Sequence, residues 1–397
     1  MPTPKKIHIL GGGQWQVPTI RLAKALGYRT LVTDIYADRP GYAWADEHAV
    51  MDISDREGTL RIARQYRIDG IVCDTTDVGV PTMAYVADKM GLPGIGYETA
   101  LNFTDKYRMR SITSAAGVPN PPFRLADSAE AACKAAADIN FPAVIKPLDN
   151  QSSRGVHIVH SPREIEAAYS DAARSTRADH ILVEGFLKGV EVTVESVCIN
   201  GEVTALGISD KDHFSHRVEV AKRLTYPADF PNPILEQIRD VNQRVINALG
   251  LRTGITHAEY MVTESDVYLV EIAARGAGSR VYSDIVPYLA GAPIPQAYLQ
   301  FIAGETFSVR VDGQPRAANL AFFSLPSGTV TRVCGVEEAR QLPGVHEILL
   351  EFGVGDRLTN PQDDRSRPGL IVVFGKSRSE VLETTDRAFR TVRVHAE

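Results

Sequence analysis

The stretch FPAVIKPLDNQSSRGV, residues 141–156, joins an apolar run to a loop of small residues through one lysine. The apolar run is typical of a buried strand, and Lys146 ends it. Backbone N–H groups of such a loop can approach phosphate oxygens closely. The loop residues that we expect at a phosphate are Ser152, Ser153, Gly155 and Val156. The loop is not a P-loop, because Gly-x-x-x-x-Gly-Lys-Ser/Thr occurs nowhere in the chain.

A lysine at the end of a strand is either a solvated edge residue or a residue that binds a ligand. The segments on either side of the loop indicate which of these applies to Lys146. Upstream, residues 104–110, TDKYRMR, contain a first lysine, Lys106. Downstream, residues 181–191 read ILVEGFLKGVE and contain Glu184 and Glu191. Two more acids follow, Glu259 in the segment HAE and Glu271 in the segment EIAARG. Cations suited to phosphates therefore precede acids suited to a metal ion.

This order and spacing over roughly residues 100–280 resembles the ATP-grasp superfamily, and the last two segments resemble its carboxylate–amine ligase branch, which includes the L-amino-acid ligases. The resemblance implies an ATP-grasp fold of α/β and α+β units: an N-terminal Rossmann-like (pre-ATP-grasp) domain, a mobile lid over ATP and a C-terminal α+β domain. It places Glu184 at the adenine amino group and Glu191 at the ribose. The residues that it implies for ATP, besides the loop, are Lys106, Lys146, Glu184, Gly185, Phe186, Leu187, Glu191 and Lys211. Lys211 lies in a polar connection, so phosphate contact and plain solvated charge both remain open.

The acid pair can be tested by counting along two strands, residues 256–263 and 267–273. If residues 264–266 form a three-residue turn, Thr263 pairs with Val267 and Glu259 falls opposite Glu271 on one face. Two facing carboxylates are destabilising unless a cation lies between them, so this register predicts Mg²⁺, with Mn²⁺ as a possible substitute. A two-residue turn would place Glu271 on the other face.

Two further residues lie near this acid pair. Arg275 follows Glu271 and suits a developing oxyanion or an acyl phosphate, because its guanidinium is a forked donor that stays charged; a surface salt bridge is the alternative. His257 shares the face of Glu259, where it is either a structural residue or a catalytic one. Many family members have Asn two residues after the second metal glutamate, and this chain has Ala273, which leaves the number of metal ions open.

Composition narrows the class of protein. The chain has 397 residues, 44% of them hydrophobic, which predicts two or three packed units. Its net charge of −6 gives no basic excess for nucleic acid or a membrane surface. The four cysteines lie far apart, which favours a reduced cytoplasmic protein. We expect no secretion signal and no membrane span, since no segment supplies about 18 uninterrupted apolar residues.

The order of expected elements gives a division into five parts. We expect a parallel Rossmann-like unit in residues 1–104, a linking helix and hinge in 105–122, the lid in 123–205, the core with the metal site in 206–305, and an α+β extension in 306–397. Residues 209–225 read as a polar connection. Gly11–Gly13 and Asp34 suggest dinucleotide binding, but Gln16 stands where the third glycine is needed, which favours a tight strand-to-helix turn.

The sequence therefore predicts an ATP-dependent ligase that activates a carboxylate as an acyl phosphate, joins it to an amine and releases ADP and phosphate, with an amino acid as one substrate. We expect small-molecule partners and a homodimer. An ATP-grasp enzyme of purine, sugar or natural-product biosynthesis is the first alternative. A non-catalytic ATP sensor is the second alternative, and Ala273 is the only residue that favours it. The sequence does not name the acid or the amine.

Overall fold

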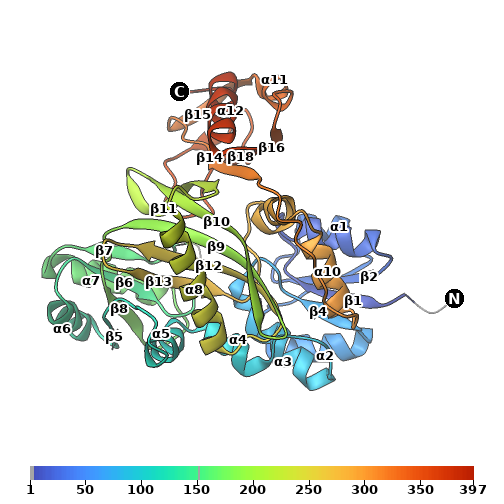
Figure 1. Cartoon of the computed structure of the whole chain (residues 1–397), viewed down its shortest axis with the longest axis horizontal. Coiled ribbons are helices and arrows are strands. Elements are labelled where there is room, and N and C mark those ends of the chain that lie inside the picture. The colour runs from blue at the N-terminus through green and yellow to red at the C-terminus, as the bar shows by residue number, and fades with distance from the viewer. Residues whose placement is uncertain (1–3, 151–152) are drawn as a thin grey trace.

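The computed structural model describes residues 4–150 and 153–397, and its first unit is a parallel sheet flanked by helices (Figure 1). The strands have the order β3-β2-β1-β4. They are β1 (Lys6–Leu10), β2 (Arg29–Asp34), β3 (Glu47–Val50) and β4 (Gly70–Val72), with helices α1 (Val17–Ala25), α2 (Arg56–Tyr66) and α3 (Val80–Met90). The expected alternation of strands and helices is confirmed. Strand β3 was missed, because it is a polar edge strand whose residues are half-buried or exposed.

Two helices, α4 (Tyr97–Thr104) and α5 (Lys106–Ala115), lead to a second unit, which lies at the left of Figure 1. Its antiparallel sheet has the order β5-β8-β6-β7. The strands are β5 (Phe123–Ala126), β6 (Ala143–Pro147), β7 (His157–Val159) and β8 (Ile181–Gly185), and the helices are α6 (Ala129–Ile139) and α7 (Ile165–Arg174). Alanines of α6 and α7 pack on this sheet. We call this unit the lid.

An eight-stranded sheet with the order β13-β12-β9-β10-β11-β14-β18-β16 connects the rest of the chain. Its strands are β9 (Val190–Ile199), β10 (Glu202–Phe214), β11 (Arg217–Tyr226), β12 (Gly254–Val262), β13 (Val267–Ala273), β14 (Ala317–Phe322), β16 (Val345–Leu350) and β18 (Gly369–Gly375). Helices α8 (Asn232–Leu249), α9 (Val286–Ala290) and α10 (Ile294–Ile302) accompany it, and α12 (Arg378–Thr391) packs on β18 and β14.

Two features of this sheet differ from the sequence prediction. Residues 209–225 are not a connection but most of the long β10–β11 hairpin. Their polar side chains misled the prediction, because one face of β10 lines a charged site instead of a core. Strand β9, which we expected beside β8 in the lid, pairs with β10 and β12 in the large sheet.

The C-terminal strands extend the large sheet, while β15 (Gly328–Cys334), β17 (Arg357–Leu358) and β19 (Arg393–Ala396) form a small separate sheet. Helix α12 begins after Ser377, whose hydroxyl caps it by accepting from the Glu380 N–H. None of the described helices combines the length and the apolar character that crossing a bilayer requires.

Candidate functional site

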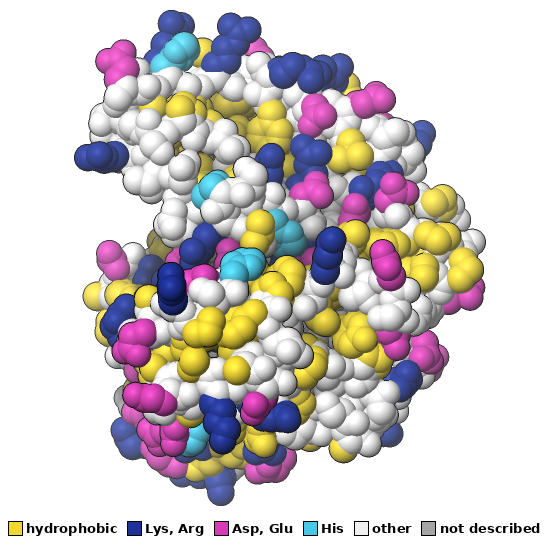
Figure 2. All heavy atoms as spheres, turned by 90° about the vertical axis from the view of Figure 1, so that its left-hand side faces the viewer, with side chains coloured by type: hydrophobic (Ala, Val, Ile, Leu, Met, Phe, Trp, Pro, Cys, Tyr) yellow, Lys and Arg dark blue, Asp and Glu magenta, His cyan; other side chains and the backbone are white. Residues whose placement is uncertain are grey.

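Charged side chains gather on one face of the large sheet, across β10, β9, β12 and β13. Residues two apart on a strand share a face, so each strand contributes alternate positions. The contributions are Ser209, Lys211 and His213 from β10, Glu191, Thr193 and Glu195 from β9, His257 and Glu259 from β12, and Glu271 from β13. Lysines from α5 and from the lid reach the same region. The face in Figure 2 is hollowed below its upper lobe, and charged side chains gather along that hollow.

The predicted pairing of the acids is confirmed, although the turn is not the one expected. Val262, not Thr263, pairs with Val267, so the turn has four residues. A bulge between Tyr260 and Glu259 then restores the register, and Glu259 pairs directly with Glu271. The register does not include Val270, whose carbonyl accepts a hydrogen bond of 2.6 Å from Arg110.

The cations that neutralise this acid pair in the structure are lysines. Lys106 Nζ lies 2.7 Å from Glu271 Oε1, and Lys211 Nζ lies 2.8 Å from Glu259 Oε1. Burial would raise the pKa of Glu259, but the charge of Lys211 and a hydrogen bond to His257 hold it well below its usual value. Glu259 is therefore a carboxylate ion opposite Glu271.

Lys211 also contacts Glu191, the residue that was predicted to bind the ribose. Its ammonium group lies 2.7 Å from Glu191 Oε1, and His213 Nε2 lies 2.8 Å from Glu191 Oε2. Burial would lower the pKa of Lys211, but the two carboxylates raise it above its usual value. Lys211 is therefore a buried charge at the centre of the site, which excludes the alternative of a solvated charge; its contact with phosphate stays a prediction.

A buried triad connects α5 to the lid. Glu184 accepts from Arg110 Nε at 2.6 Å and forms an ion pair with Lys146. Burial would raise the pKa of Glu184, but the Arg110 and Lys146 charges lower it. Burial lowers the pKa of Lys146, while Glu184 opposes the shift. Both Glu184 oxygens are thus bound by cations, and a contact of Glu184 with the adenine amino group stays a prediction.

The predicted adenine segment continues from β8 into a connection. The Gly185 N–H donates to Pro122 at 2.9 Å, and the Phe186 N–H donates to Pro142 at 3.1 Å. The Phe186 ring is exposed and Leu187 is half-buried. These contacts attach the segment to the hinge prolines on one side and to the start of β6 on the other.

The loop that was predicted to bind phosphate approaches the β10–β11 hairpin. Ser153 has a positive φ of 57° and donates to the Glu219 carbonyl at 2.7 Å. Gly155 has a φ of 71°, and a Cβ there would lie 2.8 Å from the Ser175 Cβ, so the position requires glycine. The Val156 N–H lies 3.4 Å from the Ser153 carbonyl. Ser152 lies outside the described residues.

His257 belongs to a buried chain of polar groups below the acid pair. Its Nδ1 lies 2.7 Å from Glu195 Oε1, which also accepts from Tyr226 at 3.2 Å. Its Nε2 lies 3.7 Å from Glu259. Burial would lower the pKa of His257, but Glu195 and Glu259 raise it to about 9. The ring is therefore a cation that positions Glu259, which does not decide between a structural and a catalytic role.

Arg275 is held by the N-terminal domain. Its Nε and one terminal nitrogen donate to the two oxygens of Asp77 at 2.7 and 2.9 Å. Burial would lower the pKa of Arg275, but Asp77 raises it. The predicted alternative of a surface salt bridge is wrong in one respect, because this pair is largely buried and joins two domains.

Sequence reasoning missed Arg110, His213, Glu195 and Asp77. Arg110 follows Lys106 by one helical turn and so shares its face, which was a usable signal. Glu195 and His213 share the alternation of Glu191 and Lys211 on their strands. No sequence pattern indicated Asp77, because it comes close to Arg275 only in the folded chain.

Two family models match parts of this chain. Residues 139–283 match the ATP-grasp domain, and residues 321–397 match the L-amino acid ligase C-terminal domain 2. The chain therefore contains an ATP-grasp domain, and the predicted fold is confirmed.

Curated relatives and solved structures agree with these domains. An uncharacterized protein of Sinorhizobium fredii is 27% identical over 84% of this chain and 69% of its own length. The formate-dependent phosphoribosylglycinamide formyltransferase of Burkholderia thailandensis is 25% identical over 99% of this chain and 96% of its own length. The crystal structure of L-amino acid ligase from Bacillus licheniformis covers 100% of both chains with a TM-score of 0.83 at 22% identity, a likeness of fold.

Proposed function

We propose that this chain, with its ATP-grasp domain and its C-terminal domain of the L-amino acid ligase type, is an ATP-dependent ligase that joins a carboxylate to an amine and releases ADP and phosphate. We propose that one of the two substrates, either the carboxylate or the amine, is an amino acid. The observation that carries the proposal is the placement of Lys106 and Lys211 on the facing acids Glu271 and Glu259. Lys146, which is paired with Glu184 of the lid, adds a third buried lysine.

A carboxylate and an amine remain ions at neutral pH, so the acid must be activated before an amide bond can form. Transfer of the terminal phosphate of ATP to the carboxylate gives an acyl phosphate, which the amine then attacks. In our proposal Lys106, Lys146 and Lys211 bind the ATP phosphates and neutralise the charge that develops during transfer. Ser153, Gly155 and Val156 cover the phosphates and exclude water, which would otherwise hydrolyse the acyl phosphate.

The residues present fit a magnesium ion bound together with ATP. Glu259 and Glu271 pair on neighbouring strands, and their side chains keep 24% and 32% of their surface exposed. Mg²⁺ is commonly held by one or two carboxylates together with phosphates and water. Among the residues that the structure describes, no three His, Cys, Asp or Glu side chains could hold a metal by themselves, which fits a metal that arrives with the nucleotide. Such an ion would neutralise the transferred phosphate.

Arg275 and His257 have proposed supporting roles. The Arg275 guanidinium would orient the reacting carboxylate from its position on Asp77. His257 would hold Glu259 from below through its bond to Glu195. We further propose that the protein is cytoplasmic, because the described cysteines are all free, which suits a reducing compartment. We also propose a homodimer, which light scattering would test.

The direct test is release of ADP and phosphate from ATP with the twenty amino acids supplied in pairs. Release that depends on two substrates, with formation of their amide, supports the proposal. AMP and pyrophosphate as the main products would refute the acyl-phosphate route. No nucleotide turnover with any pair would favour the second candidate.

The second candidate is a ligase of purine-type substrates. The observation in its favour is the formyltransferase of Burkholderia thailandensis, which aligns with 99% of this chain. Formate or another small acid would then be the activated carboxylate, and a phosphoribosyl amine would be the acceptor. ATP turnover that requires formate and a phosphoribosyl amine, but no amino acid, would select it.

A further inference from the structure

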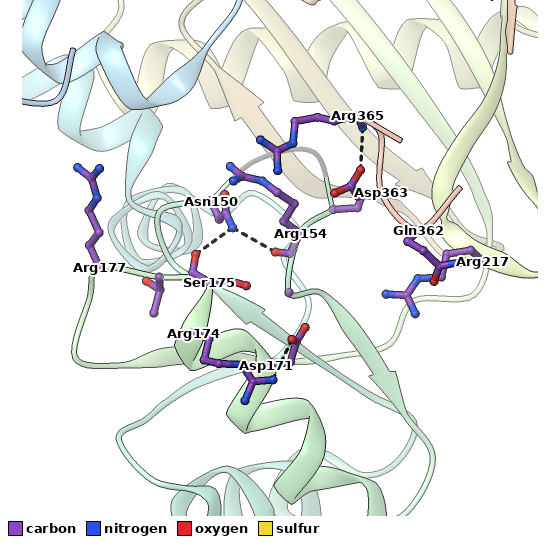
Figure 3. Close-up of a pocket in the computed structure, with 13 residues that line it drawn as sticks. Asn150, Arg154, Asp171, Arg174, Ser175, Arg177, Arg217, Gln362, Asp363 and Arg365 are labelled. Carbon is purple, nitrogen blue, oxygen red and sulfur yellow. Dashed lines mark hydrogen bonds and ion pairs between the residues drawn. The ribbon is translucent and has the colours of Figure 1, made fainter. Parts of the chain in front are cut away.

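A second cationic region lies apart from the lysine and acid site. A cavity of about 550 Å³ opens where the lid, the β10–β11 hairpin and a loop of the C-terminal domain meet. Figure 3 shows arginine side chains arranged around it. Its charged lining residues are Arg154, Arg174, Arg177, Arg217, Arg365, Asp171 and Asp363. The cations therefore outnumber the acids.

The two acids are already engaged. Asp363 Oδ1 accepts the N–H groups of Arg365 and Ser366 at 2.9 Å each, within its own turn. Asp171 lies 2.8 Å from His157 and 3.2 Å from Arg174. Asp171 is therefore paired on its own side of the cavity, while the charge of Asp363 acts on Arg154. Arg177 forms an ion pair with Asp52, which does not line the cavity.

Three of the arginines come from three different units: Arg154 from the lid loop, Arg217 from the hairpin and Arg365 from the C-terminal loop. Arg217 has Glu219 3.6 Å away, and its Nε is buried without a hydrogen-bond partner among the described residues. Burial, and next the charge of Arg365, lower the pKa of Arg154. In Figure 3 the guanidinium groups of Arg154 and Arg365 lie close together. The charges of Asp363 and Asp149 oppose this shift, but the pKa of Arg154 stays below its usual value. A bound anion would therefore stabilise the guanidinium groups further.

The backbone around the cavity is held in place by hydrogen bonds between the same three units. The Ser153 hydroxyl donates to the Glu219 carbonyl at 2.7 Å, and His216 Nε2 lies 3.0 Å from the Pro361 carbonyl. Within the lid, Asn150 donates to the Ser175 carbonyl at 2.9 Å. Arg154, Arg217 and Arg365 therefore extend from three elements that these hydrogen bonds connect around the cavity.

We propose that this cavity is a second anion site, separate from the nucleotide site, which binds a phosphate group. The guanidinium fork matches phosphate oxygens, and several forks from different directions suit a tetrahedral oxyanion. The site is separate because Lys106, Lys146, Lys211 and the acid pair do not line it. Among the described residues, the two regions share Ser153 and Gly155 of the loop. The phosphate comes either from the phosphate that the ligase releases or from a phosphate group of a substrate.

The test is calorimetric titration of the full chain with inorganic phosphate, at an ionic strength held constant with chloride. We expect saturable binding that weakens at least tenfold in Arg365→Ala and in Arg217→Ala. Arg332→Ala, which removes an exposed arginine of the C-terminal domain, is the matched control and should not change the affinity. Absence of saturable binding, or equal affinity in wild type and Arg365→Ala, would refute the site.

A second titration separates this site from the ATP phosphates. Phosphate should still bind when the protein is saturated with a non-hydrolysable ATP analogue. Loss of phosphate binding under that condition would mean that the cavity belongs to the nucleotide site, and the proposal would be wrong. Neither titration needs turnover, so both remain informative if the proposed ligase activity fails.

Inhibition of the ligase reaction by phosphate would identify the source of the bound phosphate. This experiment rests on the proposed function. Inhibition by phosphate that is noncompetitive with both the acid and the amine identifies released phosphate as the ligand. Inhibition that competes with one of these substrates identifies a substrate phosphate, as the second candidate function requires. Both patterns support the site, provided that Arg365→Ala relieves the inhibition; unchanged inhibition in that variant would count against it.

Discussion

Replacing Arg110 by Met should strongly destabilise the protein. Arg110 is 1% exposed and is bound to Glu184 at 2.6 Å, to the Val270 carbonyl at 2.6 Å and to Asn120 at 3.3 Å. Met keeps much of the apolar stem but leaves Glu184 with Lys146 alone and leaves the bulge carbonyl of Val270 without this donor. Breaking one side of a buried ion pair costs about 3–5 kcal/mol, because the remaining charge stays desolvated.

The matched control is Arg108→Met, in the same helix and two residues away. Arg108 is bound to Glu98 at 3.1 Å, but 40% of the Arg108 side chain and 77% of the Glu98 side chain are exposed. An exposed pair is worth about 0–1 kcal/mol. Urea unfolding followed by circular dichroism should therefore show a much lower midpoint for Arg110→Met than for Arg108→Met. Equal midpoints would show that the triad of Arg110, Glu184 and Lys146 does not stabilise the contact between α5 and the lid.

Three further predictions concern other parts of the molecule. Glu271→Gln should abolish ATP turnover with an unchanged circular dichroism spectrum, whereas Glu264→Gln, in the exposed turn, should keep wild-type turnover; activity in Glu271→Gln at saturating Mg²⁺ would make the acid structural. Asp74 is 1% exposed and its pKa is raised to about 6 by burial, so its ionisation costs about 3 kcal/mol of stability, fully felt above about pH 6 and absent below about pH 4. Asp74→Asn should therefore raise the melting temperature at pH 8 but not at pH 4, and an equal effect at both would refute the assignment. Amide exchange of residues 153–156 should slow when a non-hydrolysable ATP analogue and Mg²⁺ bind, and unchanged exchange would remove the loop from the nucleotide site.

Strand alternation was sufficient to predict much of the charged face. His257 and Glu259 lie on one face, as the alternation along their strand indicated, and His257 Nε2 lies 3.7 Å from Glu259. The pairing of Glu259 with Glu271 was also predicted correctly. The structure reaches this pairing by a different route, because two deviations from the assumed turn cancel each other. A four-residue turn shifts the register by one residue, and the bulge at Val270 shifts it back. A bulge leaves no clear signal in one sequence, so the correct pairing rested partly on the resemblance.

Contacts between distant segments could not be predicted in the same way. Asp77 and Arg275 belong to different domains, and neither has a neighbour in the sequence that suggests the other. The hairpin at residues 209–225 was missed because its polar side chains were interpreted as solvent-facing, although Ser209 is fully buried and Lys211 is nearly so. Arg365 reaches the lid from the last domain, where no motif could be assigned.

The facing acids also show where a physical argument from sequence stops. Two opposed carboxylates require positive charge nearby, and that premise holds for Glu259 and Glu271. It does not specify the kind of cation, and in the structure Lys106 and Lys211 supply the charge. Each lysine forms an ion pair with one acid, and both were predicted to bind ATP phosphates. If ATP draws the lysines toward its phosphates, the acids lose their counter-charges at the moment when a metal ion bound to those phosphates can replace them. ATP and Mg²⁺ should therefore bind to this site cooperatively, because each compensates for the charge that the other displaces.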